Sequence, residues 1–394
     1  MSGFWRLMLY GKGPREAEAP ARDLRIDVIR GLILLIIFVN HIPGNVVSFV
    51  TPRNYGFSDA ADVFVLLAGI SAAFAYGRQI DQRGLLVGSL KVCARIWTLY
   101  VAHLALFVLV CGVVATAIAR TQNSLYMEWI NVLPFFSDTV EAVINALQLS
   151  YQPDYLNILP LYIVLLAAFP LAYLAVRTSP LAALLASLAL WQAASAFDLN
   201  LPSKPGGSGW YFNPFAWQAI FVIGIVMGRF ATLGVRQPRI LAIDVAAAGL
   251  LLFSAAVKLS TGNPFGVAFL SDWIEGLQMG VDKTNLATIR LLHLLALAWI
   301  VIRLIPAESR LLRGPVGTRL AATGRHSLEV FCVGIVLSII GQIVMAEMSF
   351  ALWAQLLFVA GGLILLIGLG LFLSWYKSLT ARPVGVARER AATA

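Results

Sequence analysis

Ten long runs of apolar residues alternate with short polar segments along the chain. An α-helix needs about 20 mostly apolar residues to cross a bilayer core of about 30 Å, and the runs meet this length, although the one after Pro180 is short. The runs begin near Ile26, Ser58, Arg95, Leu156, Pro180, Asn213, Ile240, Leu286, His326 and Phe350. The pattern therefore predicts an all-α, polytopic membrane protein with about ten transmembrane helices.

The composition supports this prediction and excludes other classes of protein. Hydrophobic residues make up 59% of the chain and charged residues 12%, whereas about a quarter of the residues of soluble proteins are charged. The mean hydropathy is +0.82. The formal charge is +9, but the basic residues form short clusters between the apolar runs. Such clusters are typical of membrane topology, so we expect no nucleic-acid partner.

The basic residues also predict the orientation of the helices. If the chain begins in the cytoplasm, 23 of its 29 Lys and Arg residues lie on the cytoplasmic side and 5 outside, with Arg290 inside a span. Cytoplasmic loops are enriched in Lys and Arg. We therefore expect both termini in the cytoplasm and place the protein in the bacterial inner membrane.

The chain divides into a cytoplasmic N-terminal segment (1–21), a transmembrane domain (22–376) and a basic cytoplasmic tail (377–394). The first 25 residues lack an apolar core, so we expect no cleavable signal peptide. The three cysteines of the chain lie inside apolar runs and have neither disulfide nor metal-ligand spacing. The segments 119–155, 198–213 and 259–285, predicted to lie outside, are rich in aromatic, Asp, Asn and Gly residues, and long loops often bind ligands.

The first apolar run carries a candidate catalytic histidine. Arg30 and His41 are eleven residues apart, which is three helical turns plus about 20°, so they share one helix face about 16 Å apart along the axis. Asp27 lies within about 40° of this stripe. An arginine near the cytoplasm could hold coenzyme A phosphates while the thioester reaches His41. Alternatively, Arg30 anchors the helix and His41 is a buried hydrogen-bonded residue, although ionisable groups inside membranes usually mark sites.

The second run opens with two carboxylates, Asp59 and Asp62, three residues apart and level with His41. Either could accept a hydrogen bond from the imidazole and orient His41 as a base. Asp59 could equally cap the helix N-terminus, whereas Asp62 lies a turn inside and is harder to explain as a cap.

Three further basic residues are candidates for binding an acyl donor. Lys91 and Arg95 lie four residues apart at the cytoplasmic end of the third run, where they hold phosphates or anchor the helix. Arg290 shares a helix face with His293 inside the eighth run. A carboxylate on the acyl group, or a counter-charge from Asp59 or Asp62, would explain an arginine there.

An aromatic segment follows the Gly-rich outer loop. It contains four candidates for binding a sugar acceptor: Trp210, Asn213, Trp217 and Gln218. Aromatic faces and amides suit sugar rings, but an interfacial aromatic belt has the same composition.

Several of these segments together resemble the OpgC family of integral-membrane proteins, within the wider acyltransferase family 3 superfamily. The matching segments are 25–32, 40–43, 51–65, Gly69, 159–162, 213–218, 290–293 and 324–331. The resemblance runs from about residue 22 to 376. It implies transfer of succinyl groups from cytoplasmic succinyl-coenzyme A to osmoregulated periplasmic glucan. By this resemblance His41 is the catalytic histidine and Arg30 the arginine of the first-span motif.

The sequence therefore predicts an O-acyltransferase in which His41 deprotonates a glucan hydroxyl, with an acyl-histidine intermediate as a variant. Asp59 or Asp62 would orient His41, and Arg290 would bind a succinyl carboxylate or stabilise oxyanion charge. The predicted partners are acyl-coenzyme A, glucan and the bilayer, with no metal or resident cofactor; glucan-synthesis proteins or a second copy remain open. The main alternative is a secondary transporter of a sugar or organic anion, although the chain shows no repeated halves. A non-enzymatic flippase or partner subunit is a third.

Overall fold

The computed structural model describes Met8 and residues 23–207, 209–235, 237–261 and 281–380. The predicted segment 1–21 (except Met8), most of 259–285 and most of 377–394 lie outside these residues. Within them the chain is helical and contains no β-strand, only an isolated bridge between Pro202 and Gly209. The all-α prediction is confirmed for this part of the chain.

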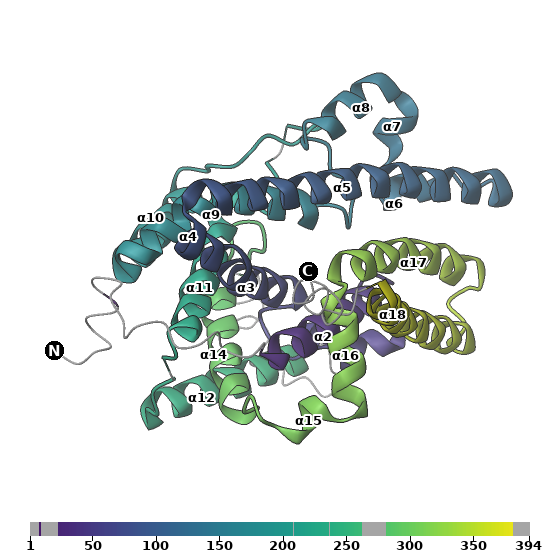
Figure 1. Ribbon diagram of the computed structural model, residues 1–394. Helices are drawn as coiled ribbons and strands as arrows, with labels where there is room; N and C mark the ends of the chain where they lie inside the picture. The colour runs from purple at the N-terminus through teal and green to yellow at the C-terminus, as the bar shows by residue number, and fades with distance from the viewer. Residues whose placement is uncertain (1–7, 9–22, 208, 236, 262–280, 381–394) are drawn as a thin grey trace, which may run out of the picture.

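Each predicted run coincides with a long helix. The long helices are α2 (Leu24–Asn40), α3 (Ala60–Ala72), α5 (Leu85–Thr121), α9 (Ile158–Thr178), α10 (Pro180–Ala196), α11 (Pro214–Thr232), α12 (Leu241–Thr261), α14 (Thr288–Leu304), α17 (Ser327–Glu347) and α18 (Leu352–Thr380). The third run shows the largest shift, because α5 begins well before Arg95. In Figure 1, α5 extends along one side of the molecule, and α17 lies beside α18 at one end.

Shorter helices connect the long ones. They are η1 (Val46–Val50), η2 (Pro52–Asn54), η3 (Ala73–Gly77), α4 (Arg78–Arg83), α6 (Leu125–Trp129), α7 (Leu133–Ser137), α8 (Thr139–Leu147), α15 (Arg310–Arg313) and α16 (Pro315–Arg325). The π-helical segment η3 joins α3 to α4, so one continuous helix runs from Ala60 to Arg83.

Seven helices of the described chain are long and apolar enough to cross a membrane: Ala60–Arg83, α5, α9, α11, α12, α17 and α18. The other three long helices, α2, α10 and α14, have 17 residues each. The helices establish a membrane protein, while the total of ten spans and the cytoplasmic termini stay predictions.

Two helix pairs approach closely at glycines. A Cβ atom on Gly31 of α2 would overlap the Leu320 carbonyl of α16, and one on Gly324 would overlap the Asp27 carbonyl. Gly69 of α3 and Gly224 of α11 face each other in the same way. Small residues permit such close packing between membrane helices. These contacts hold α2 and α3, which carry the candidate residues, in the centre of the bundle.

Ion pairs join the helices at the end predicted to be cytoplasmic. Asp27 of α2 lies 3.5 Å from Arg325 of α16. In α12, Asp244 accepts a 2.6 Å hydrogen bond from Arg303 of α14. Many basic residues at this end are therefore structural partners of aspartates.

Candidate active site

The start of α3 is built around its two carboxylates. Asp59 is the N-cap residue and accepts a hydrogen bond from the Ala61 amide at 2.8 Å. Asp62, one turn inside, accepts a hydrogen bond from the Asp59 amide at 2.7 Å. This reciprocal arrangement is a capping box. The capping alternative therefore describes the local geometry of both residues, including Asp62, for which we did not expect it.

A network of four charges surrounds these carboxylates. Asp62 is completely buried, and Arg290 of α14 donates to it at 2.5 Å while lying 3.3 Å from Asp59. Lys283 donates to Asp59 at 2.6 Å. Two negative and two positive side chains balance, which makes their burial tolerable. Asp59 and Asp62 are therefore the counter-charges that Arg290 needs.

His41 lies directly after α2, at its C-cap. Gln342 of α17 donates to its backbone carbonyl at 2.9 Å, and its ring centroid lies 4.6 Å from that of Tyr155 at a tilt of 51°. Its Nδ1 atom is buried and has no hydrogen-bond partner in the part of the chain that the structure describes. No hydrogen bond from the His41 ring to Asp59 or Asp62 is found among the described residues, and both carboxylates are ion-paired with Lys283 or Arg290.

A cavity of about 440 Å³ opens beside His41. It is lined by Ile37, Asn40, His41, Pro43, Gly44, Arg53, Asp59, Ala60, Ala61, Asp154, Tyr155, Asn157, Ile158, Tyr211, Phe212, Lys283 and Phe331. The first residues of α3 and α9 are in this lining, and helix N-termini carry partial positive charge. Arg53 and Lys283 add two full positive charges near His41. Since Nδ1 is buried, Nε2 is the ring nitrogen left for a ligand in this cavity.

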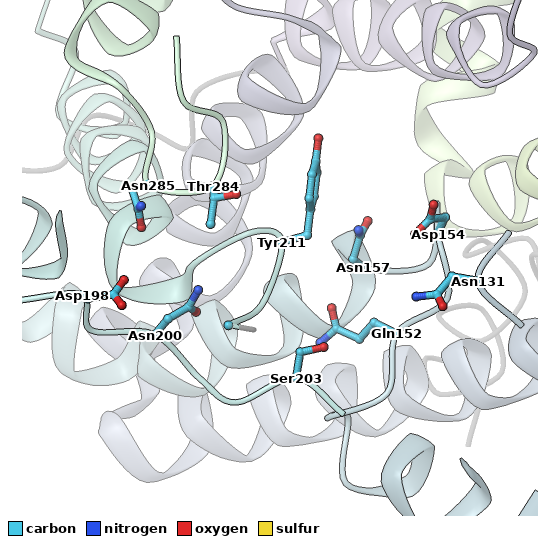
Figure 2. A pocket seen from close by; sticks show the side chains of 11 residues that line it. Asn131, Gln152, Asp154, Asn157, Asp198, Asn200, Ser203, Tyr211, Thr284 and Asn285 are labelled. Carbon is cyan, nitrogen blue, oxygen red and sulfur yellow. The ribbon is translucent and has the colours of Figure 1, made fainter. Parts of the chain in front are cut away.

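A second cavity, of about 380 Å³, adjoins the first and is strongly polar (Figure 2). It is lined by Asn131, Gln152, Asp154, Asn157, Asp198, Asn200, Ser203, Gly209, Tyr211, Thr284 and Asn285. Asp154, Asn157 and Tyr211 line both cavities. We call the first the histidine cavity and the second the amide cavity.

Two groups at the boundary have perturbed acidity. Burial among the surrounding residues raises the pKa of the Asp154 carboxyl, although its side chain is exposed to the cavities. Burial, and then the nearby Asp154 charge, raise the pKa of the Tyr155 hydroxyl. Tyr155 therefore stays protonated near neutral pH and can donate a hydrogen bond to a ligand beside His41.

The predicted donor-binding residues do not form one group. Arg30 donates to Ser71 of α3, and both Arg30 and Arg95 act electrostatically on Tyr162 of α9. Lys91 is exposed on α5, one turn from Arg95. Arg290 is separate, because it is bound in the charge network at the other end of α3. Donor binding stays a prediction for Arg30, Lys91 and Arg95.

The four predicted acceptor-binding residues line neither cavity. Trp217 is completely buried and donates to the Lys283 carbonyl at 3.0 Å, and Asn213 donates to the Asn285 side chain at 2.8 Å. Trp210 is buried and donates to the Pro202 carbonyl, and Gln218 bonds to Ser187. They brace the segments that carry cavity residues, and a direct acceptor-binding role for them stays a prediction.

Three residues of the histidine cavity were not predicted as site residues from the sequence: Arg53, Tyr155 and Lys283. A signal was available for two of them: Arg53 and Lys283 are among the few basic residues predicted to lie outside. Tyr155 ends the long segment 119–155, which was marked only as a region rich in aromatic and polar residues.

The helices and cavities together define a membrane protein with two adjoining polar cavities, one of them beside His41. The family model described as "OpgC protein" matches residues 22–378, and the chain belongs to this family. Membership indicates a glucan-modifying membrane transferase. No curated protein and no solved structure matches the chain.

Proposed function

We propose that this protein transfers an acyl group, preferentially succinyl, from cytoplasmic acyl-coenzyme A to a hydroxyl of periplasmic glucan across the bacterial inner membrane. The observation that carries the proposal is His41. Its ring lines a cavity, its Nδ1 has no hydrogen-bond partner among the described residues, and the neighbouring Asp59 and Asp62 are ion-paired with Lys283 and Arg290. A buried imidazole that the fold does not use is available for proton transfer.

The reaction needs one proton carrier and one site for negative charge. Nε2 of His41 takes the proton as the glucan hydroxyl oxygen attacks the thioester carbonyl. The C–O bond forms, the C–S bond breaks, and His41 returns the proton to the departing coenzyme A thiolate. Tyr155, beside the ring, donates a hydrogen bond to one of the reacting oxygens.

Positive groups around the histidine cavity suit the charge that develops. The N-termini of α3 and α9 stabilise an oxyanion through their amide dipoles. Arg53, which is exposed and has no carboxylate within 4 Å in the described chain, suits the free carboxylate of a succinyl group. The sequence assigned this role to Arg290, but Arg290 already has two carboxylate partners, Asp59 and Asp62. We therefore assign the role to Arg53.

The donor enters from the other end of α2. Arg30 lies about 16 Å from His41 by the helix rise, a span comparable to an extended pantetheine arm. Arg30 and Arg95 meet around Tyr162, and Lys91 lies one turn further along α5. These three cations suit the phosphates of coenzyme A at the cytoplasmic entrance.

The experiment is a transfer assay with purified protein, succinyl-coenzyme A and neutral β-glucan oligosaccharide. We expect free coenzyme A and ester-linked succinate in equal amounts, and both products to form about 10²–10⁴ times more slowly with His41→Ala. Donor hydrolysis without ester would contradict glucan transfer. If wild-type protein makes no ester but vesicles containing it accumulate a sugar or an organic anion, the transporter alternative replaces this proposal.

A further inference from the structure

The amide cavity has a composition suited to neutral, hydroxyl-rich ligands. Five amide side chains, three hydroxyl side chains and two carboxylates line it, and none of the described lining residues is basic. Its volume of about 380 Å³ is typical of a small-molecule site. Amides and carboxylates can each satisfy several hydroxyl groups.

Part of this lining is held rigid by the fold. Asn200 donates to the Trp210 carbonyl at 3.0 Å, Gln152 donates to the Leu149 carbonyl at 2.8 Å, and Asn285 accepts from Asn213 at 2.8 Å. These hydrogen bonds anchor three walls of the cavity. A binding site whose polar groups are already oriented loses less entropy when a ligand binds.

Another part of the lining is left without partners. Within the described chain, the side chains of Asn131, Asn157, Asp154 and Asp198 make no hydrogen bond to the protein. In Figure 2 the two carboxylates lie on opposite sides of the ring of polar groups, with Tyr211 between them. The cavity therefore offers free acceptors and donors from more than one side.

The two cavities differ in charge although they share a boundary. Asp198 lines only the amide cavity, and Asp154 lines both cavities. Three charged residues line only the histidine cavity: Arg53, Lys283 and Asp59. Lys283 is paired with Asp59 and lies 5.9 Å from the Tyr211 ring centroid, on the histidine side. The charges around the histidine cavity therefore balance, whereas the amide cavity has two carboxylates and no basic residue in its described lining. An anionic group is disfavoured in the amide cavity, since like charges brought together in a site oppose binding.

We infer that the amide cavity holds unsubstituted sugar residues of the acceptor next to the hydroxyl that reacts, and that Asp154 and Asp198 reject residues that already carry an anionic substituent. This inference rests on the proposed function. Its consequence is spacing: a succinylated sugar leaves the site and cannot sit in the cavity while its neighbour reacts. Substituents would then be separated along the glucan.

The first test measures binding without any donor. Neutral β-glucan oligosaccharide and the same oligosaccharide succinylated chemically are titrated into purified protein by calorimetry. We expect wild-type protein to bind the neutral form about tenfold more tightly. The double variant Asp154→Asn, Asp198→Asn should reduce this preference to about twofold or less. Asp198 has a φ of 52°, which asparagine adopts readily, so its backbone should not change.

Two controls separate charge from position. Glu128→Gln removes one negative charge from an exposed residue of α6 that lines neither cavity, and it should keep the preference. Ser203→Trp fills the amide cavity and should weaken binding of the neutral form, whereas Ser124→Trp, outside both cavities, should not. Equal binding of both oligosaccharides by wild type, or unchanged binding by Ser203→Trp, overturns the inference.

The second test reads the products of transfer. Mass spectrometry of glucan treated with wild-type protein should show few adjacent succinylated residues, and the double aspartate variant should increase adjacent substitution. Unchanged adjacency in that variant contradicts the role of the carboxylates. The binding test needs no transfer, so a protein that binds as expected but forms no ester refutes the proposed function alone.

Discussion

The continuous helix from Ala60 to Arg83 has a charge cluster at each end, and the two clusters are built from similar residues. At one end, Asp81 of α4 binds Arg229 at 3.2 Å, Arg177 at 3.3 Å and the Tyr173 hydroxyl at 2.5 Å. At the other end, Asp59 and Asp62 bind Arg290 and Lys283. Each cluster joins helices that are distant in the sequence.

The two clusters differ in what lies next to them. Neither of the two cavities reaches Asp81, whose partners are all protein groups. Asp59 faces the histidine cavity, where His41, Tyr155 and Arg53 have groups left for a ligand. Buried charge alone therefore does not identify a functional site in this membrane protein. The informative feature is a charge network that borders a cavity with unused polar groups.

The largest expected effect comes from removing the histidine at one end and the tyrosine at the other. His41→Ala should lower the transfer rate by about 10²–10⁴, because general-base help is lost. Tyr173→Phe should leave the rate within about threefold, because it removes only one member of a structural network. Expression and donor affinity should remain near normal in both variants, as measured by detergent-solubilised yield and by donor titration. Normal transfer by His41→Ala would leave Asp59 or Asp62 as the candidate base.

Neutralising one pair in each cluster gives the second comparison. Arg229→Ala and Arg290→Ala should both lower the folded yield, since each removes a buried cation from a carboxylate. The loss should be smaller for Arg229→Ala, because Arg177 also lies 3.3 Å from Asp81. The double variants Asp81→Asn, Arg229→Gln and Asp62→Asn, Arg290→Gln should recover much of it. We expect the first double variant to transfer at a near-normal rate and the second to lose about tenfold, since Asp62 and Arg290 hold Asp59 and Lys283 beside His41. Equal rates would assign both clusters a structural role only.

The donor entrance offers a smaller effect. In the triple variant Arg30→Ala, Lys91→Ala, Arg95→Ala, donor affinity should fall by about tenfold, and more at low salt, where charge attraction is least screened. Acceptor affinity should not change, because these residues lie at the far end from both cavities. Isothermal titration with coenzyme A at two salt concentrations measures donor affinity, and titration with neutral β-glucan oligosaccharide measures acceptor affinity. Unchanged donor affinity would return all three residues to the role of helix anchors.

The helices could be predicted from the sequence because a membrane imposes one strong pattern. Runs of apolar residues located all the long helices, and the capping preference of aspartate was recognised for Asp59. The helical period also placed Arg30 and His41 on one side of α2: Arg30 contacts α3 at Ser71, and His41 shares a cavity with Asp59 of α3. These features depend on residues near one another in the chain.

The surroundings of His41 could not be predicted, because they come from distant segments without periodic structure. Tyr155 and Lys283 reach it from loops, and no local pattern specifies how a loop folds over a bundle. The aromatic segment shows the same limit. Its composition suits sugar stacking or a membrane belt, and neither reading predicts that Trp217 donates to the Lys283 carbonyl. An indole N–H that is buried needs a partner, and the sequence does not show which carbonyl will supply it.

The smallest perturbation tests whether the two compared ends lie on opposite sides of the membrane. Ser203→Cys introduces a thiol at the amide cavity, and Ser309→Cys introduces one at the N-cap of α15, near the other end of the bundle. Ser309 lines neither cavity, so Ser309→Cys should transfer at a near-normal rate. A membrane-impermeant maleimide added to spheroplasts should label Ser203→Cys and should label Ser309→Cys only after lysis. Labelling of Ser309→Cys in intact spheroplasts would overturn the ten-span topology, and the route from a cytoplasmic donor at Arg30 to a periplasmic acceptor at His41 with it.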